Sequence, residues 1–154
     1  MKENEKLQKL FRDHFNGAPW IEVQITGSLK NIKAAYAAKN VSGLNSIWQI
    51  VHHMTCWRET LLARLRGVHV PSPADNYFIP IADTSAKAWT KTLTRLNASQ
   101  KNILLYLQKE WKDADEKPGN SPYSRYELIQ GLLQHDAYHL GQIILIKKLL
   151  PAGK

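Results

Sequence analysis

The chain has 154 residues, which is enough for a single domain with a sizeable hydrophobic core, and we expect one domain over residues 1–154. Hydrophobic residues make up 44% of the chain and charged residues 22%, as in ordinary globular proteins. No apolar run approaches the roughly 20 residues needed to span a membrane. The first fifteen residues contain no apolar signal core, so we expect a cytoplasmic protein. The one cysteine, Cys56, excludes an intrachain disulfide.

The formal net charge of +8 raises the question of a nucleic-acid or membrane partner. The lysines and arginines are scattered along the chain, with no compact basic run and no recognised nucleic-acid-binding motif. We therefore interpret the charge as a solvated basic surface and expect neither partner.

The first predicted helix covers residues 3–16 and ends at Gly17 and Pro19. Its apolar stripe consists of Leu7, Leu10, Phe11 and Phe15. The sequence of residues 18–43 predicts an irregular connection that contains short helical segments. We expect Trp20 and Ile21 to fold back over the core. Either Ser28 or Asn31 is expected to cap a short helix that continues through Ala38.

The second long helix is expected to begin after Asn45 or Ser46 and to run to about Arg66, before Gly67. Its helically spaced residues are Ile47, Ile50, Val51, Met54, Trp57, Arg58, Leu61 and Leu65, with Arg58 as the polar exception. Residues 68–83 contain three prolines and predict a long crossing loop. We expect its Tyr77 and Phe78 to pack over one end of the helices.

The third predicted helix starts at Thr84 or Ser85, and residues 112–122 form a polar turn region. Its buried face comprises Trp89, Leu93, Leu96, Ile103, Leu107 and Trp111. Ser124 caps the fourth helix, and Glu127 completes a capping box. This helix reaches Leu150, before Pro151 and Gly153. Four amphipathic helices and no alternating strand pattern predict an all-α four-helix bundle with long inter-helix connections.

Two histidines interrupt the apolar seam of the fourth helix. The seam consists of Leu128, Leu132, His135, His139, Ile143, Ile146 and Leu150, at spacings of three or four residues. A four-residue separation places His135 and His139 about one turn apart on the same side of a helix. Each buried imidazole requires partners for its nitrogens, so this pair indicates a metal site.

Catalytic zinc sites usually have three protein ligands, so a third ligand is needed. The second helix offers His52 and His53. His53 falls roughly 100° from the centre of the apolar stripe, at the edge of the buried face beside Trp57, whereas His52 falls on nearly the opposite side and is expected to meet solvent. His53 is therefore the better candidate. Cys56 is a weaker alternative, because it points further from the stripe.

Other polar and aromatic residues near these helices are candidates for the surroundings of the site. Gln142 follows His139 by three residues and is expected to support a ligand or contact a substrate, since neutral amides are poor ligands for transition metals. Gln49 is expected at the rim of the pocket. Asp136 is expected to pair with a basic residue. Trp20, Trp57, Tyr138 and the 68–83 loop are candidates for the walls of the substrate pocket.

Two segments carry most of a family resemblance: SIWQIVHHMTCWRETLLARLRG (46–67) and GLLQHDAYHLGQIILIKK (131–148). Together with GAPWIE (17–22), they resemble the DinB-like family, also called the DinB/YfiT-like metalloenzymes. The resemblance implies a four-helix bundle that carries a divalent metal, most often zinc or nickel. It implies His135 and His139 as two ligands. The second-helix ligand normally has tryptophan four positions after it, a pattern that falls on His53 and Trp57.

The same resemblance implies several kinds of activity, because family membership implies a site and does not determine a reaction. Some relatives transfer low-molecular-weight thiols of the bacillithiol type, and others hydrolyse or isomerise small electrophilic substrates. We therefore expect a metal-dependent transferase or hydrolase acting on a small molecule. The alternative is a non-catalytic metal-bound bundle that serves as a sensor or interaction module. Relatives are often homodimers, and the second stripe of the last helix, Ile129, Leu133, Leu140 and Ile144, is compatible with a dimer interface.

Overall fold

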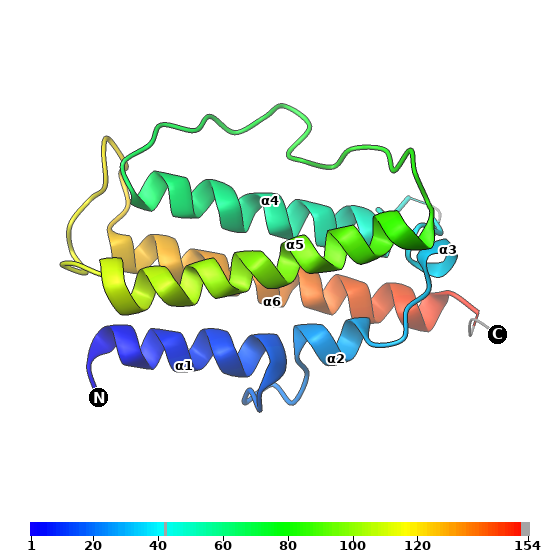
Figure 1. Cartoon of the computed structure of the whole chain (residues 1–154), viewed down its shortest axis with the longest axis horizontal. Helices are drawn as coiled ribbons and strands as arrows, with labels where there is room; N and C mark the ends of the chain where they lie inside the picture. Colours follow the sequence, from blue (N-terminus) through cyan, green and yellow to red (C-terminus); the bar gives the residue numbers. More distant parts are fainter. Residues whose placement is uncertain (42, 152–154) are drawn as a thin grey trace.

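The computed structural model describes residues 1–41 and 43–151, so the predicted position of Gly153 lies outside the described residues. Long helices lying side by side dominate the molecule (Figure 1). The described residues contain helices and no β-strand, which confirms the all-α prediction. The helices are α1 Glu3–Asn16, α2 Ile25–Leu29, α3 Ala34–Ala37, α4 Ile47–Leu65, α5 Ala86–Leu105, the π-helical segment η1 Tyr106–Glu110 and α6 Arg125–Leu149.

The helix directions require one long connection. In Figure 1, α1 and α6 run one way along the bundle, and α4 and α5 run the other way. Because α4 and α5 are consecutive and parallel, residues 66–85 must travel back along the whole length of α4. Short α2 continues the line of α1, and α3 lies at the far end. Every helix in the described part of the chain is too short or too polar to cross a membrane.

Serine side chains start the three longest helices, as the sequence predicts. Ser46, Ser85 and Ser124 each accept a hydrogen bond from the backbone N–H three residues later. Gln49 and Glu127 complete capping boxes by accepting from the backbone N–H of the capping serine. Gly67, with φ +84°, ends α4 in the left-handed region that glycine tolerates best.

The connection between α1 and α4 differs from the prediction. Trp20 is 96% exposed and Ile21 is 44% exposed, so neither folds back over the core. The predicted caps Ser28 and Asn31 are also wrong. Gln24 caps α2 through its side chain, while Asn31 has φ +62° in the bend that separates α2 from α3. A single capped helix through Ala38 is therefore replaced by two short ones.

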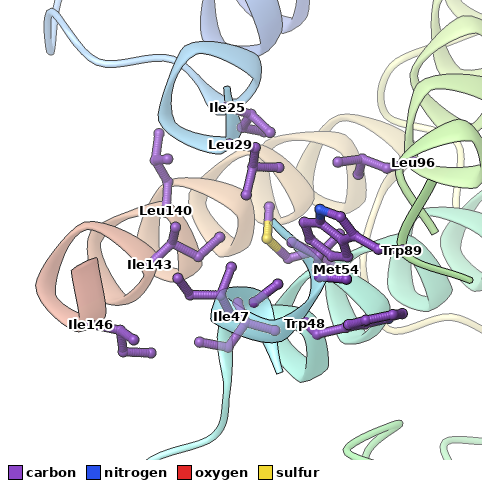
Figure 2. Packing of buried hydrophobic residues seen from close by; sticks show 14 of the residues in the cluster. Ile25, Leu29, Ile47, Trp48, Met54, Trp89, Leu96, Leu140, Ile143 and Ile146 are labelled. Carbon is purple, nitrogen blue, oxygen red and sulfur yellow. The ribbon is translucent and has the colours of Figure 1, made fainter. Parts of the chain in front are cut away.

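The hydrophobic core is divided into two parts along the bundle. One part joins α2, α4, α5 and α6 around Met54, Trp89 and Ile143, as Figure 2 shows. The other joins α1, the end of α4, η1 and the start of α6 around Phe11, Leu65 and Ile129. Buried polar residues occupy the level between them, including His53, Arg58, Asp136 and His139. The site therefore lies in a polar layer between two apolar cores.

The second stripe of the last helix is largely part of this core. Ile129 and Leu140 are almost completely buried inside the chain, so they are not available to a partner. Leu133 and Ile144 are half-buried against the same core. Ile129 and Leu140 are therefore the members of this stripe that face the bundle, and dimerisation stays a prediction.

Replacing Ser46 with Ala should lower the free energy of unfolding by about 1 kcal/mol, because the backbone N–H of Gln49 loses its acceptor at a buried helix start. Urea denaturation measures the change. Thr94→Ala is the matched control, since its exposed hydroxyl lies within α5 and alanine favours a helix. A Ser46→Ala loss no larger than that of the control would contradict the assigned cap.

Candidate metal centre

Helices α4 and α6 bring three histidines together at the polar layer. One ring nitrogen each from His53, His135 and His139 lies within 4.8 Å of the other two. The Nε2 atoms of His53 and His135 are 2.9 Å apart. The ring centroid of His139 lies 4.5 Å from that of His53 and 4.4 Å from that of His135. The three histidines that the sequence selects therefore form one cluster.

Hydrogen bonds define the tautomer of two of these rings. His53 Nδ1–H donates to the carbonyl oxygen of Asn76 (2.6 Å), and His139 Nδ1–H donates to Gln142 Oε1 (2.7 Å). A neutral imidazole that donates from Nδ1 carries its lone pair on Nε2. Both rings therefore present Nε2 as a ligand atom, with the other nitrogen held as in known metal-ligating histidines.

The third ring has an unsatisfied nitrogen. His135 Nδ1 is buried without a hydrogen-bond partner and lies 3.8 Å from Asp136 Oδ1. If His135 donated from Nε2 to His53, its Nδ1 lone pair would face a carboxylate oxygen. If His135 held a metal through Nε2, its Nδ1 would carry the proton and face the carboxylate favourably. The cluster thus fits a metal ion better than it fits a simple hydrogen-bonded pair.

Burial favours the uncharged form of two of the three rings, those of His53 and His139. Desolvation lowers the pKa of His53 from 6.5 to about 4, although its hydrogen bond to the Asn76 carbonyl opposes the shift and the neighbouring histidines add to it. Desolvation also lowers the pKa of His139. A metal must compete with protons for imidazole lone pairs, so low pKa values leave these ligands available.

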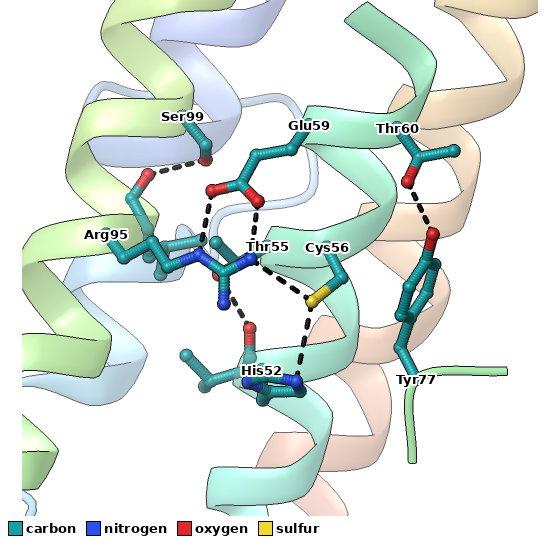
Figure 3. Close-up of polar contacts among 10 residues, drawn as sticks. His52, Thr55, Cys56, Glu59, Thr60, Tyr77, Arg95 and Ser99 are labelled. Carbon is teal, nitrogen blue, oxygen red and sulfur yellow. Dashed lines mark hydrogen bonds and ion pairs between the residues drawn. The ribbon is translucent and has the colours of Figure 1, made fainter. Parts of the chain in front are cut away.

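The 68–83 loop covers one side of the cluster. The ring of Phe78 stacks on that of His53, with centroids 4.0 Å apart and planes 10° from parallel. Trp57 Nε1–H donates to Asn76 Oδ1, and the hydroxyls of Tyr77 and Thr60 share a hydrogen bond (Figure 3). Tyr77 and Phe78 thus pack over the middle of α4. Their predicted position at one end of the bundle is wrong, because the loop runs back along the whole helix.

Backbone strain marks the segment of this loop that reaches the cluster. Asn76 has φ +52° and Tyr77 has φ +62°, and residues other than glycine rarely adopt such values. Two consecutive left-handed residues turn the Asn76 carbonyl toward His53 and the Tyr77 hydroxyl toward Thr60. The contacts with α4 thus hold a backbone shape that the local sequence disfavours.

A buried ion pair lies directly behind the cluster. Arg58 Nη2 is 2.7 Å from Asp136 Oδ2, and both side chains are fully buried. Burial would raise the pKa of Asp136, but Arg58 and the neighbouring His135 together outweigh it and hold that pKa below its ordinary value. Arg58 also donates to Gln100, which in turn donates to the carbonyl of Phe11. This network connects α1, α4, α5 and α6. It also confirms the prediction that Asp136 pairs with a basic residue.

The remaining candidates lie around the cluster at different depths. Gln142 hydrogen-bonds His139, and the ring of exposed Tyr138 lies 4.9 Å from the His139 ring. Trp57 lies beside His53 and His135. Gln49 caps α4 and donates to the carbonyl of Ile79, so it anchors the loop. Trp20 lies between α1 and α2 and is almost fully exposed, so it does not line a pocket as expected.

His52 and Cys56 form a separate group on the other side of α4. Cys56 Sγ lies 3.4 Å from His52 Nε2 and 3.5 Å from an Arg95 nitrogen, and Arg95 is paired with Glu59 (Figure 3). His52 is half-buried and does not point into the cluster, although sequence reasoning placed it in solvent. Burial raises the pKa of the Cys56 thiol, which disfavours the thiolate that binds metals.

One contributor to the site, Asn76, was missed from the sequence. It supports His53 through its backbone carbonyl, and any residue has a carbonyl. Its position depends on where a loop of sixteen residues crosses α4, which no local pattern specifies. An Asn-Tyr pair between prolines was the available signal, and it indicates a turn without indicating a target.

The fold and the cluster together define a helical bundle with a three-histidine site that fits a divalent metal. Comparison with known families then gives the same assignment that the sequence suggested. The family model described as the DinB superfamily matches residues 24–143, and the chain belongs to this superfamily. No curated protein and no solved structure matches the chain.

Replacing Asp136 with Asn should lower the free energy of unfolding by about 3–5 kcal/mol, because the Arg58 charge stays buried without a counter-ion. The double variant Arg58→Met/Asp136→Asn should recover most of this loss. Arg66→Met is the control, since it removes an exposed pair with Glu110 and should cost less than about 1 kcal/mol. Urea denaturation measures all three, and a single-variant loss as small as that of the control would contradict the argument.

The metal-free protein should lose stability as the pH falls from about 6.5 to about 4. In this pH window His53 is protonated in the unfolded chain and neutral in the folded chain. Lowering the pH therefore reduces the free energy of unfolding, by up to about 3 kcal/mol from this residue. Denaturation in chelator at several pH values measures the slope, which His53→Gln should reduce. His69→Gln, which removes an exposed histidine of the loop, is the matched control. Equal slopes for wild type and His53→Gln would refute this assignment.

Proposed function

We propose that this protein is a metal-dependent enzyme that transfers a low-molecular-weight thiol to small electrophilic substrates or hydrolyses them. One divalent metal is held by His53, His135 and His139. The observation that carries the proposal is the convergence of three imidazoles, two of them with Nδ1–H committed to another acceptor. Structural zinc sites usually close with four protein ligands, whereas three protein ligands leave a position for water or substrate.

The donor set favours zinc or nickel. Imidazole nitrogens suit these metals, whereas magnesium and calcium prefer carboxylate and carbonyl oxygens. The nearest carboxylate, Asp136, is engaged by Arg58 and supports His135 from behind. Membership of the DinB superfamily supports the same assignment.

A divalent ion held by three neutral ligands keeps its full charge and lowers the pKa of a bound water or thiol. The protein residues prepare the site for such chemistry. Phe78 and the loop shield His53 from water, and Gln142 holds the His139 ring in one orientation. His135 is the most accessible ligand, with its side chain 27% exposed, whereas His53 and His139 are nearly buried. The site is therefore open on the His135 side.

Thiol transfer agrees better than hydrolysis with these surroundings. Water attack benefits from a general base near the nucleophile, and Asp136 is committed to an ion pair. A metal held by the three histidines would lower the pKa of a thiol, so thiol transfer would need no further base from the protein. With their Nε2 lone pairs engaged by the metal, His53 and His139 would not act as proton acceptors.

Protein purified without an affinity tag should contain about one metal ion per chain, because a three-histidine site whose rings are held by hydrogen bonds to Asn76 and Gln142 retains zinc or nickel. His139→Ala should lose the metal and turnover of a thiol with an electrophile such as a haloarene or an epoxide. Elemental analysis and a thiol-consumption assay measure the two quantities. His52→Ala is the matched control, since this adjacent histidine points away from the cluster and its removal should leave the metal content unchanged.

Three outcomes separate the possibilities. Metal loss and activity loss together in His139→Ala support the proposal. Metal without turnover in the wild type, with a melting temperature that falls on chelation, favours the non-catalytic sensor or interaction module. Turnover that persists in a metal-free His139→Ala protein would contradict a metal-dependent reaction.

A further inference from the structure

A cavity of about 430 Å³ opens beside the accessible ligand of the cluster, and His135 is part of its lining. The cavity lies between α4 and α6. One wall consists of Trp57, Leu61 and Arg64, which recur at helical spacing on α4. The other wall comes from the first half of α6, up to His135. The volume is in the range of pockets that bind small molecules.

The centre of this cavity is apolar. Trp57, Leu61, Leu128 and Leu132 line it, and Asn76 of the loop closes the end near the cluster. The side chains of Trp57 and His135 are neighbours, with ring centroids 6.3 Å apart. A molecule lying along the leucines would therefore place one end at His135.

The two charged residues of the lining are already paired with protein groups. Arg64 donates to the carbonyl of Val70 and to the hydroxyl of Ser72, and its guanidinium lies 5.3 Å from the Trp57 ring. The Glu127 carboxylate accepts from the backbone N–H of Ser124 in the capping box. One positive and one negative charge, both engaged, give the cavity no strong preference for a charged ligand.

No side chain projects into the cavity from Gly131 of α6. It lies one turn before His135, within the helix, where glycine is the poorest helix former apart from proline. No packing constraint requires it, because a Cβ atom added there would meet nothing within 4 Å. Its missing side chain leaves the cavity open next to the cluster.

We infer that this groove between α4 and α6 binds the uncharged apolar body of the substrate, an aromatic or branched-alkyl group, with the electrophilic carbon directed toward His135. The inference rests on the proposed function and names its substrate class. Gly131 determines the size of the group that fits. The thiol or water approaches from the same open side, and the loop blocks the opposite side.

Three probes with the same naphthalene body and different charge test the groove: 2-naphthalenemethanol, 2-naphthalenesulfonate and 2-naphthylmethylammonium. Isothermal titration calorimetry of the purified protein measures the affinity for each. We expect the uncharged probe to bind at least roughly threefold more tightly than either charged probe, because a charged group must be desolvated beside side chains that are already paired.

Gly131→Leu should weaken binding of 2-naphthalenemethanol by at least roughly tenfold, because leucine fills the apolar space that the probe would occupy. Gly141→Leu is the matched control. Gly141 is also an exposed glycine within α6 whose added Cβ would meet nothing within 4 Å, and it lies outside this cavity. Both changes replace glycine with a good helix former, so both variants should stay folded by circular dichroism.

Metal content measured on the same samples separates this inference from the proposed function. Tight binding that only Gly131→Leu abolishes supports the groove, whether or not metal is present. Three results would overturn the inference: equal affinity of wild type and Gly131→Leu, an equal loss of affinity in Gly141→Leu, or preferential binding of a charged probe. If the same samples contained metal, the proposed function would still stand. Absence of metal would defeat the proposed function without affecting the groove.

Discussion

The buried ion pair between Arg58 and Asp136 is the interaction on which the site depends. Two fully desolvated charges are stable only as a pair, so α4 and α6 must meet where these residues face each other. His53 lies five residues before Arg58, and His135 is adjacent to Asp136. The pair therefore sets the axial position of one helix against the other, and this register places the three histidines together. We interpret the pair as the interaction that sets the register of α4 against α6, which is the best-attested role of buried polar groups.

The polar layer that contains this ion pair also divides the hydrophobic core into two parts. Apolar clusters on either side exclude water from the polar level, which makes each polar group there depend on a protein partner. Arg58 donates to Gln100 of α5, which in turn donates to the backbone carbonyl of Phe11 in α1. Asn76 and Gln142 support the histidines from the loop and from α6. The cluster is thus held rigidly by groups from most of the molecule, which favours a defined ligand geometry over a flexible one.

Chain topology explains why the site is covered on one side and open on the other. Parallel α4 and α5 force their connection along the bundle, and this connection stacks Phe78 on His53 (Figure 1). On the other side, the groove along Leu61 and Gly131 leads to His135. The path of this one long loop therefore explains why His53 and His139 are covered while His135 stays accessible.

Helical periodicity and capping residues determined the four long helices, because local backbone preferences suffice for them. The spacing of His135 and His139, the position of His53 on the edge of its stripe, and the likeness to the DinB-like family determined the candidate site. Only the tertiary structure decided that Trp20 is exposed, that Asp136 and Arg58 are partners, and that Tyr77 and Phe78 cover the middle of α4. These features depend on contacts between residues far apart in the chain. The Asn76 carbonyl shows the reason most clearly, since its role comes from where a loop passes and not from the identity of its side chain.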